Sequence, residues 1–140
     1  MKKGISLILC LAILISCVSV SAFAYVIPWA RGEITTTVNG NVLLCSICHY
    51  TADTNQEMYV VASWYGAPAT VIATMEAVNY YTGATFFPKT QDIQYNSNIA
   101  DAWRYPALSA TEKIRVYGRA EVSGSGYYGI TPVYSVILNG

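Results

Sequence analysis

The side chains best suited to chemistry lie together in one short stretch, Cys45-Ser46-Ile47-Cys48-His49. It holds the only histidine of the chain and both cysteines that follow residue 24. The spacing Cys-x-x-Cys-His is that of c-type haem attachment, in which two thiols form thioether bonds and the histidine ligates the iron. Met58 or Met75 could then supply the second axial ligand. Such motifs normally open a helix, so this interpretation depends on the local backbone.

Three other interpretations use the same side chains. An exported pair of cysteines tends to oxidise, which makes Cys45 and Cys48 a disulfide candidate. A redox-active Cys-x-x-Cys needs a helix start that lowers one thiol pKa. A structural zinc site needs four protein ligands, so Asp53 or Glu57 would have to complete it. We place a structural disulfide or buried thiols first, haem second, and redox or zinc chemistry last.

The sequence around this stretch predicts a strand. Residues 33–38 alternate and are rich in β-branched side chains, and Asn39-Gly40 follows as a hairpin signal, because a type I′ turn needs positive φ at both central residues. The return strand, residues 41–51, then contains both cysteines. In a regular strand, residues three apart are separated by roughly 10 Å and point to opposite faces, whereas a disulfide needs about 4.4–6.8 Å between Cα atoms. A disulfide therefore requires a bend at Ser46-Ile47; otherwise the thiols are free or pair between chains, with His49 on the face opposite Cys48.

The start of the chain predicts export. A positive beginning, an apolar run over residues 5–20 and the small-x-small site Ala22-Phe23-Ala24 indicate a signal peptide over residues 1–24. The mature chain, residues 25–140, is then one domain by size. Two alternatives stay open, a retained membrane anchor and a lipoprotein processed at Cys17. The residues after Cys17 are apolar and unlike a polar tether, so cleavage after Ala24 ranks first.

The charge of the mature chain excludes some partners. Removing Lys2 and Lys3 leaves six basic residues against eight acidic ones, a net charge of −2. A strongly basic nucleic-acid binder is therefore excluded as the default interpretation, and so is simple electrostatic binding to anionic lipid. No second long apolar run follows the signal, so we expect no membrane span after cleavage.

Several stretches predict strands. Residues 57–65 alternate, and residues 113–122 do so most clearly, with one wet and one buried face. Residues 69–81 fit either a helical stripe or a strand, and their β-branched content favours the strand. Thr82-Gly83 then predicts a hairpin turn. Residues 127–138 predict a last strand, interrupted at Pro132.

Two stretches are less regular. Residues 88–106 are polar and predict a long irregular connection, which is either functional or hides a short strand. Ser109-Ala110-Thr111-Glu112 resembles a helix capping box, but the period of two that follows it overrules a helix.

These patterns predict an all-β fold, a small antiparallel β-sandwich or open barrel of about six to eight strands over residues 25–140. On it, the row Lys113, Arg115 and Arg119, with Tyr117 between, could contact a glycan or surface polymer. Such a row is more often the solvated face of an edge strand that resists aggregation.

The exported β pattern, rich in Tyr, Thr, Ser and Ala, resembles small secreted β-sandwich proteins of Gram-positive bacteria, among them the lactococcin-type bacteriocins. The resemblance lies in composition and strand rhythm and transfers no residue or activity. We expect a small exported bacterial protein, secreted or at the cell surface, without enzymatic activity, catalytic residues, metal or cofactor. It would act by contact with a surface polymer or another protein, in an adhesive or bacteriocin-like role. The alternative is an exported monohaem electron carrier that uses Cys45, Cys48 and His49.

Overall fold

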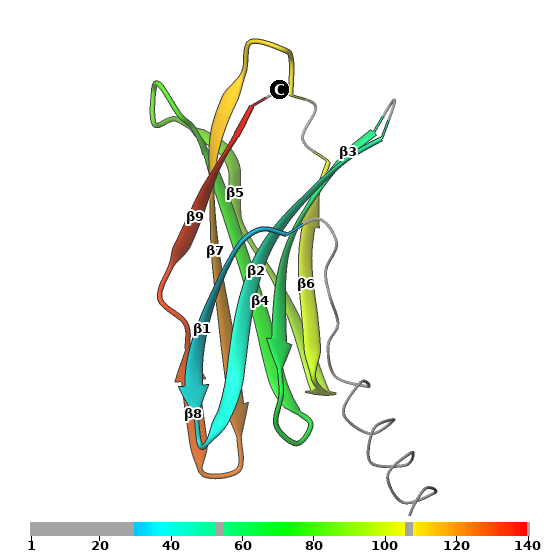
Figure 1. The fold of residues 1–140 in the computed structure, drawn as a ribbon, viewed down its shortest axis with the longest axis vertical. Helices are drawn as coiled ribbons and strands as arrows, with labels where there is room; N and C mark the ends of the chain where they lie inside the picture. The colour runs from blue at the N-terminus through cyan, green and yellow to red at the C-terminus, as the bar shows by residue number, and fades with distance from the viewer. Residues whose placement is uncertain (1–29, 53–54, 106–107, 140) are drawn as a thin grey trace, which may run out of the picture.

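The computed structural model describes residues 30–52, 55–105 and 108–139, and their regular structure is antiparallel β-sheet (Figure 1). The predicted signal peptide over residues 1–24, with Cys17, lies outside the described residues. In the part of the chain that is described, no helix has the length and hydropathy needed to cross a membrane.

The strands form two sheets that pack face to face (Figure 1). The first sheet has the order β1 (Ala30–Val38), β2 (Asn41–Ala52), β3 (Asn55–Trp64), β6 (Ile99–Arg104). The second sheet has the order β5 (Thr85–Ser97), β4 (Ala69–Asn79), β7 (Lys113–Gly124), with β8 (Tyr127–Ile130) and β9 (Tyr134–Asn139) both pairing with β7. The predicted all-β sandwich is confirmed, with nine strands among the described residues.

The hairpin that positions the cysteines forms as predicted. Asn39 and Gly40 have φ values of 47° and 77°, as a two-residue type I′ turn requires. From Leu43 opposite Trp64 to Ala52 opposite Asn55, β2 pairs with β3 without a register shift. The backbone therefore does not bend between the two cysteines.

Residues 69–81 and the turn before β7 also behave as predicted. β4 is a strand whose inward positions are buried, so the helical alternative is wrong. Ser109 donates its backbone N–H to the Glu112 carboxylate at 2.7 Å, as in a capping box. A strand rather than a helix follows from Lys113. The capping hydrogen bond therefore stabilises one turn over residues 109–112 and does not start a helix.

Of the two alternatives for residues 88–106, the irregular connection is wrong and the hidden strand is correct. This segment contains most of β5 and all of β6. β5 is an edge strand and is mostly exposed, so its polar side chains hide the alternation that marks a half-buried strand. Pro88 is tolerated there because an edge strand has backbone N–H groups that need no ladder partner.

The core lies between the sheets, and the sheets approach closely at Gly118 of β7. A Cβ atom at this position would lie 3.0 Å from Ile47 and 3.1 Å from Val60, both completely buried side chains of the first sheet. Contacts this short leave little room for a methyl group, because protein cores are close-packed. Gly118 thus brings the backbone of the second sheet against the side chains of the first.

Side chains close the lateral edges of the sandwich. On one side, the Asp92 carboxylate of β5 accepts the backbone N–H of Asp101 in β6 at 2.9 Å, and Arg104 of β6 donates to the Thr90 hydroxyl of β5. On the other side, the ring of Tyr134 in β9 lies against Gly32 of β1. The edge strands of the two sheets are therefore tied to each other across the sandwich.

Candidate functional site

The structure places Cys45 and Cys48 on opposite faces of β2. Cys45 belongs to the core cluster between the sheets, and Cys48 lies three residues further along a regular ladder. Both are buried and both are free thiols. The predicted disulfide between them is therefore not formed, and the interpretation as buried thiols describes the structure. A covalent haem does not fit either, because one porphyrin cannot reach thiols on both faces of a strand.

Burial also makes these thiols unreactive. It raises the pKa of Cys45 to about 12, with a further rise from Cys48 and an opposing effect of the hydrogen bond with Thr131. Burial and the nearby charge of Glu33 raise the pKa of Cys48 to about 11. A redox-active or metal-binding cysteine needs a thiolate near neutral pH. Both side chains stay protonated there, so the geometry does not favour redox chemistry.

His49 lies on the inward face of β2, opposite to the face of Cys48 as the strand prediction expected, and it is buried. It is 5% exposed and lies opposite Met58 of β3, which is completely buried. Among the described residues no three His, Cys, Asp or Glu side chains gather closely enough to hold a metal ion. Asp53, one of the two residues considered for zinc, lies outside the described residues. The motif is thus buried but divided between the two faces of β2, with Cys45 in the core and Cys48 on the opposite face.

The basic row of β7 does face solvent, but the expectation of an edge strand is wrong. β7 lies inside the second sheet, with β4 on one side and β8 and β9 on the other. Near one end of the row, Lys113 Nζ lies 4.4 Å from the centre of the Tyr80 ring, and the Arg115 guanidinium lies 5.5 Å from it. These are distances at which a cation is attracted to an aromatic face. The Tyr80 ring therefore holds two cations of the row in place on the solvent face of β7.

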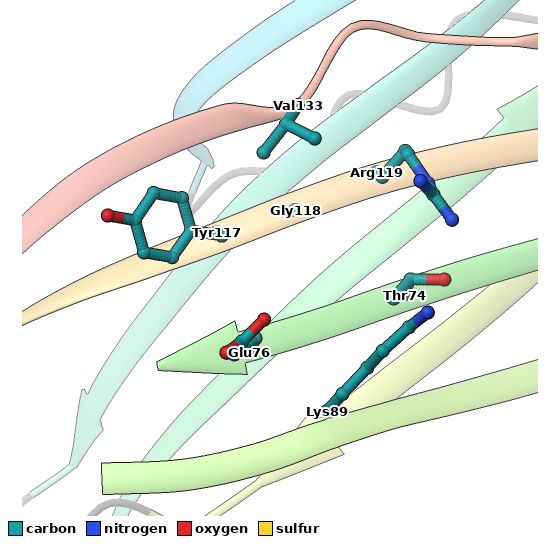
Figure 2. Close-up of a pocket in the computed structure, with 7 residues that line it drawn as sticks. All are labelled: Thr74, Glu76, Lys89, Tyr117, Gly118, Arg119 and Val133. Atoms are coloured by element: carbon teal, nitrogen blue, oxygen red, sulfur yellow. The ribbon is translucent and has the colours of Figure 1, made fainter. Parts of the chain in front are cut away.

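A hollow opens on this same outward face, further along β7 (Figure 2). Its volume is about 140 Å³, and it is open to solvent. Besides Gly118, the lining residues come from three strands, β4, β5 and β7, and from the connection between β8 and β9: Thr74, Glu76, Lys89, Tyr117, Arg119 and Val133. The lining therefore combines two cations, one carboxylate, a hydroxyl, an aromatic ring and an aliphatic wall.

The hollow lies beside a break between β8 and β9. Pro132 follows Thr131, and proline has no N–H with which to continue a ladder. Instead, Thr131 pairs with Ala120 of β7: its N–H donates to the Ala120 carbonyl at 2.9 Å, and its hydroxyl accepts the Ala120 N–H at 3.1 Å. The Val133 side chain, which follows Pro132, is exposed and lies at the rim of the hollow. The interruption that the sequence predicted at Pro132 thus shapes the site.

Hydrogen bonds fix two polar groups of the hollow. Arg119 donates to the Glu121 carboxylate at 2.7 Å, and its Nε is buried without a hydrogen-bond partner among the described residues. Thr74 is 7% exposed and accepts a hydrogen bond from Gln91 at 3.0 Å. A hydroxyl that accepts one hydrogen bond can still donate its own hydrogen. The hollow therefore presents two hydrogen-bond donors, Arg119 and Thr74, whose positions are fixed by other contacts.

Part of this site is predicted by the sequence. The basic row includes Arg119 and Tyr117, whereas Thr74, Glu76 and Val133 were not predicted as site residues. Thr74 and Glu76 occupy outward positions of β4, opposite Arg119 and Tyr117 respectively. The alternation in residues 69–79 signals that they face outward, but only the strand register places them beside the basic row.

Comparison with known proteins provides no relative from which a role could be transferred. No protein-family model, curated protein or solved structure matches the chain. The functional argument therefore rests on the surface and the hollow described above.

Proposed function

We propose that the protein is a small exported bacterial β-sandwich that acts by contact, binding an anionic polymer at the cell surface or in the medium. The outward face of the second sheet is the contact surface. The protein holds the polymer without changing it chemically, in an adhesive or bacteriocin-like role.

The observation that carries this proposal is the separation of charge between the two outward faces. The second sheet displays four cations on its outward face, Lys89, Lys113, Arg115 and Arg119, against the carboxylates of Glu76 and Glu121. The first sheet displays three carboxylates, Glu33, Glu57 and Asp101, against one exposed cation, Arg31. A chain whose net charge is negative after signal cleavage thus presents one basic surface, and such a surface attracts polyanions at short range.

The location of the reactive side chains supports binding rather than catalysis. A nucleophile needs a neighbouring base that can take its proton. His49 is buried in the core, and the two thiols are protonated and buried. The hollow is lined by Glu76 and Thr74 on the same strand, with no histidine or cysteine beside them.

Binding to three polysaccharides tests the proposal: polygalacturonate as the anionic polymer, dextran as the neutral one and chitosan as the cationic one. We expect polygalacturonate alone to bind, with an affinity that falls as salt is raised from about 0.05 M to about 0.5 M, because salt screens exposed charges. Single-stranded DNA of matched charge measures how much of the binding any polyanion would show.

A pair of variants locates the surface. Lys113→Gln/Arg115→Gln removes two charges from the second sheet and should weaken binding by about tenfold, whereas Glu57→Gln on the first sheet should change it by less than about twofold. Equal binding of dextran and polygalacturonate, or depolymerisation of any of these substrates at enzyme-like rates, would contradict the proposal.

A further inference from the structure

We infer that the hollow between β4, β5 and β7 binds one monoanionic, hydroxyl-rich unit of the polymer, such as a uronic acid or a polyol phosphate diester. This inference rests on the proposed function, since it names the subsite and the chemical class that the basic face recognises. It does not follow from charge alone, because the hollow also contains a carboxylate.

The size of the hollow suits one unit of a polymer. Sites that enclose a whole small-molecule ligand have volumes of roughly 300–1,000 Å³, whereas this hollow measures about 140 Å³ and is open to solvent. The open side leaves the rest of a polymer chain outside the hollow, in solvent. One unit can therefore enter while its neighbours lie on the basic row.

One end of the hollow is suited to an anionic group. Figure 2 shows the Lys89 amine directed toward Thr74, with the Arg119 guanidinium on the neighbouring strand. Arg119 is already held by Glu121, and its Nε has no partner among the described residues. With Glu121 bound to Arg119 at this end, Lys89 supplies the cationic donor, while Glu76 lies at the other end, so the hollow suits no more than one anionic group.

The other end is suited to hydroxyl groups and a carbon skeleton. In Figure 2 the Glu76 carboxylate lies between Tyr117 and Lys89. A carboxylate accepts up to four hydrogen bonds and donates none, so it binds ligand hydroxyls and repels ligand anions. The Tyr117 ring and the Val133 methyl groups supply apolar surface for the C–H groups of a sugar or polyol. The two ends together describe a ligand with one negative charge and several hydroxyls.

Two substitutions separate this inference from simple polyanion binding. Lys89→Gln inside the hollow and Lys113→Gln outside it remove the same charge from the same face. We expect Lys89→Gln to weaken binding of polygalacturonate by at least about tenfold, as for loss of a hydrogen bond to a charged group. Lys113→Gln should weaken it by less than about threefold.

Glu76→Ala gives a test of sign. If charge alone drives binding, removing this carboxylate strengthens the binding of a polyanion. If Glu76 accepts ligand hydroxyls, the same substitution weakens binding by about threefold or more. Circular dichroism and thermal unfolding of each variant show whether the fold is retained. Glu76 and Lys89 are exposed, so neither substitution removes a core contact.

Short ligands distinguish the two sources of the monoanion. Trigalacturonate, a glycerol phosphate trimer and maltotriose are titrated into the ¹⁵N-labelled mature protein, and amide shifts of Gly118 and Val133 report occupancy of the hollow. We expect shifts with one or both anionic ligands and none with maltotriose. If polygalacturonate binds but Lys89→Gln and Lys113→Gln weaken it equally and Glu76→Ala strengthens it, the inference fails and the proposed function stands. If neither polygalacturonate nor the glycerol phosphate trimer binds, both fail.

Discussion

The two outward faces of this sandwich have the same kind of backbone but differ in charge and in surface shape. Both belong to antiparallel sheets whose strands alternate between core and solvent, and both carry tyrosine and β-branched side chains. The first sheet displays Glu33, Glu57 and Asp101, and buries Ser46 and Cys48 in its centre. The second displays a basic row and has a hollow where β8 gives way to β9. The two faces thus differ in charge and in one interruption of a strand.

The comparison also shows where each property originates. Alternation along a strand decides whether a residue faces the core or the solvent. The topology then decides which of the two solvent faces receives it. Lys89 and Arg119 are thirty positions apart in the chain, yet the order β5-β4-β7 places both beside Thr74.

The largest effect is expected where the two sheets meet. Gly118→Ala places a methyl group about 3.0 Å from Ile47 and 3.1 Å from Val60, so the sheets must separate or the side chains must move. Overpacking of this kind lowers the free energy of unfolding by about 1–3 kcal/mol. Urea denaturation measures it, with Ser135→Ala on the exposed surface of β9 as a control expected to change little. Equal stability of the two variants would mean that the core at Gly118 is loosely packed.

A smaller and local effect is expected at the break that distinguishes the second sheet. Thr131→Val removes the hydroxyl that accepts the Ala120 N–H and leaves that buried donor unpaired, at a cost of about 1 kcal/mol or more. Hydrogen exchange should speed up at Ala120 while amides of β2 and β3 keep their protection. Thr131→Ser retains the hydroxyl and should restore most of the protection. Uniform loss of protection in both sheets would show that the break is not a local feature.

The two cysteines, one in the core and one on the opposite face of the first sheet, make the free energy of unfolding depend on pH. Because burial holds both thiol pKa values above 9, the value in the unfolded chain, their contribution to stability is complete below pH 9. It is lost as pH rises toward about 11 for Cys48 and about 12 for Cys45. Urea denaturation from pH 8 to pH 11 should therefore show falling stability, with a weaker fall in Cys48→Ala.

Alkylation by iodoacetamide checks the same assignment. At pH 8 the folded protein should react slowly at both thiols, and the urea-unfolded chain rapidly. As pH rises, Cys48 on the first sheet should react before Cys45 in the core. Rapid labelling of Cys45 in the folded protein would contradict its position between the sheets.

The smallest expected effect is a change in the pKa of Asp101 on the first sheet. Burial and, secondarily, the neighbouring charge of Asp92 raise the pKa of Asp101 above its usual value. Asp92→Asn removes the charge and keeps an oxygen that can accept the Asp101 N–H. The Asp101 pKa, followed by NMR titration, should fall toward its usual value, and the amides lining the hollow should not shift. An unchanged pKa would assign the whole shift to burial.

Much of the fold could be predicted because local signals and tertiary packing agree. The Asn39-Gly40 turn and the alternation in β7 both specify strands without reference to the rest of the chain. Residues 88–97 could not be predicted as a strand, since most of β5 is exposed and has no buried face to impose a period of two. β6 does alternate, but its buried positions include Ala100 and Ala102, whose small side chains give a weak signal. The pairing of β5 with β4 and of β6 with β3 is a long-range property.

The candidate site divides in the same way. Arg119 and Tyr117 belong to a visible row, whereas the place of Glu76 depends on the register that sets it opposite Tyr117. Conversely, the cysteine and histidine cluster is conspicuous by residue type, yet the regular β2 ladder turns its members to opposite faces. Residue type predicted chemistry there, and strand geometry decided against it.

The closed edges of the sandwich have a consequence for how the protein exists at high concentration. A free sheet edge can pair with a strand of another molecule and start a growing fibril. Here the Asp92 carboxylate already holds the Asp101 amide, and Tyr134 covers Gly32 on the opposite side. Under the proposed function, copies that bind along one polymer should therefore lie side by side as separate molecules rather than join through their sheet edges.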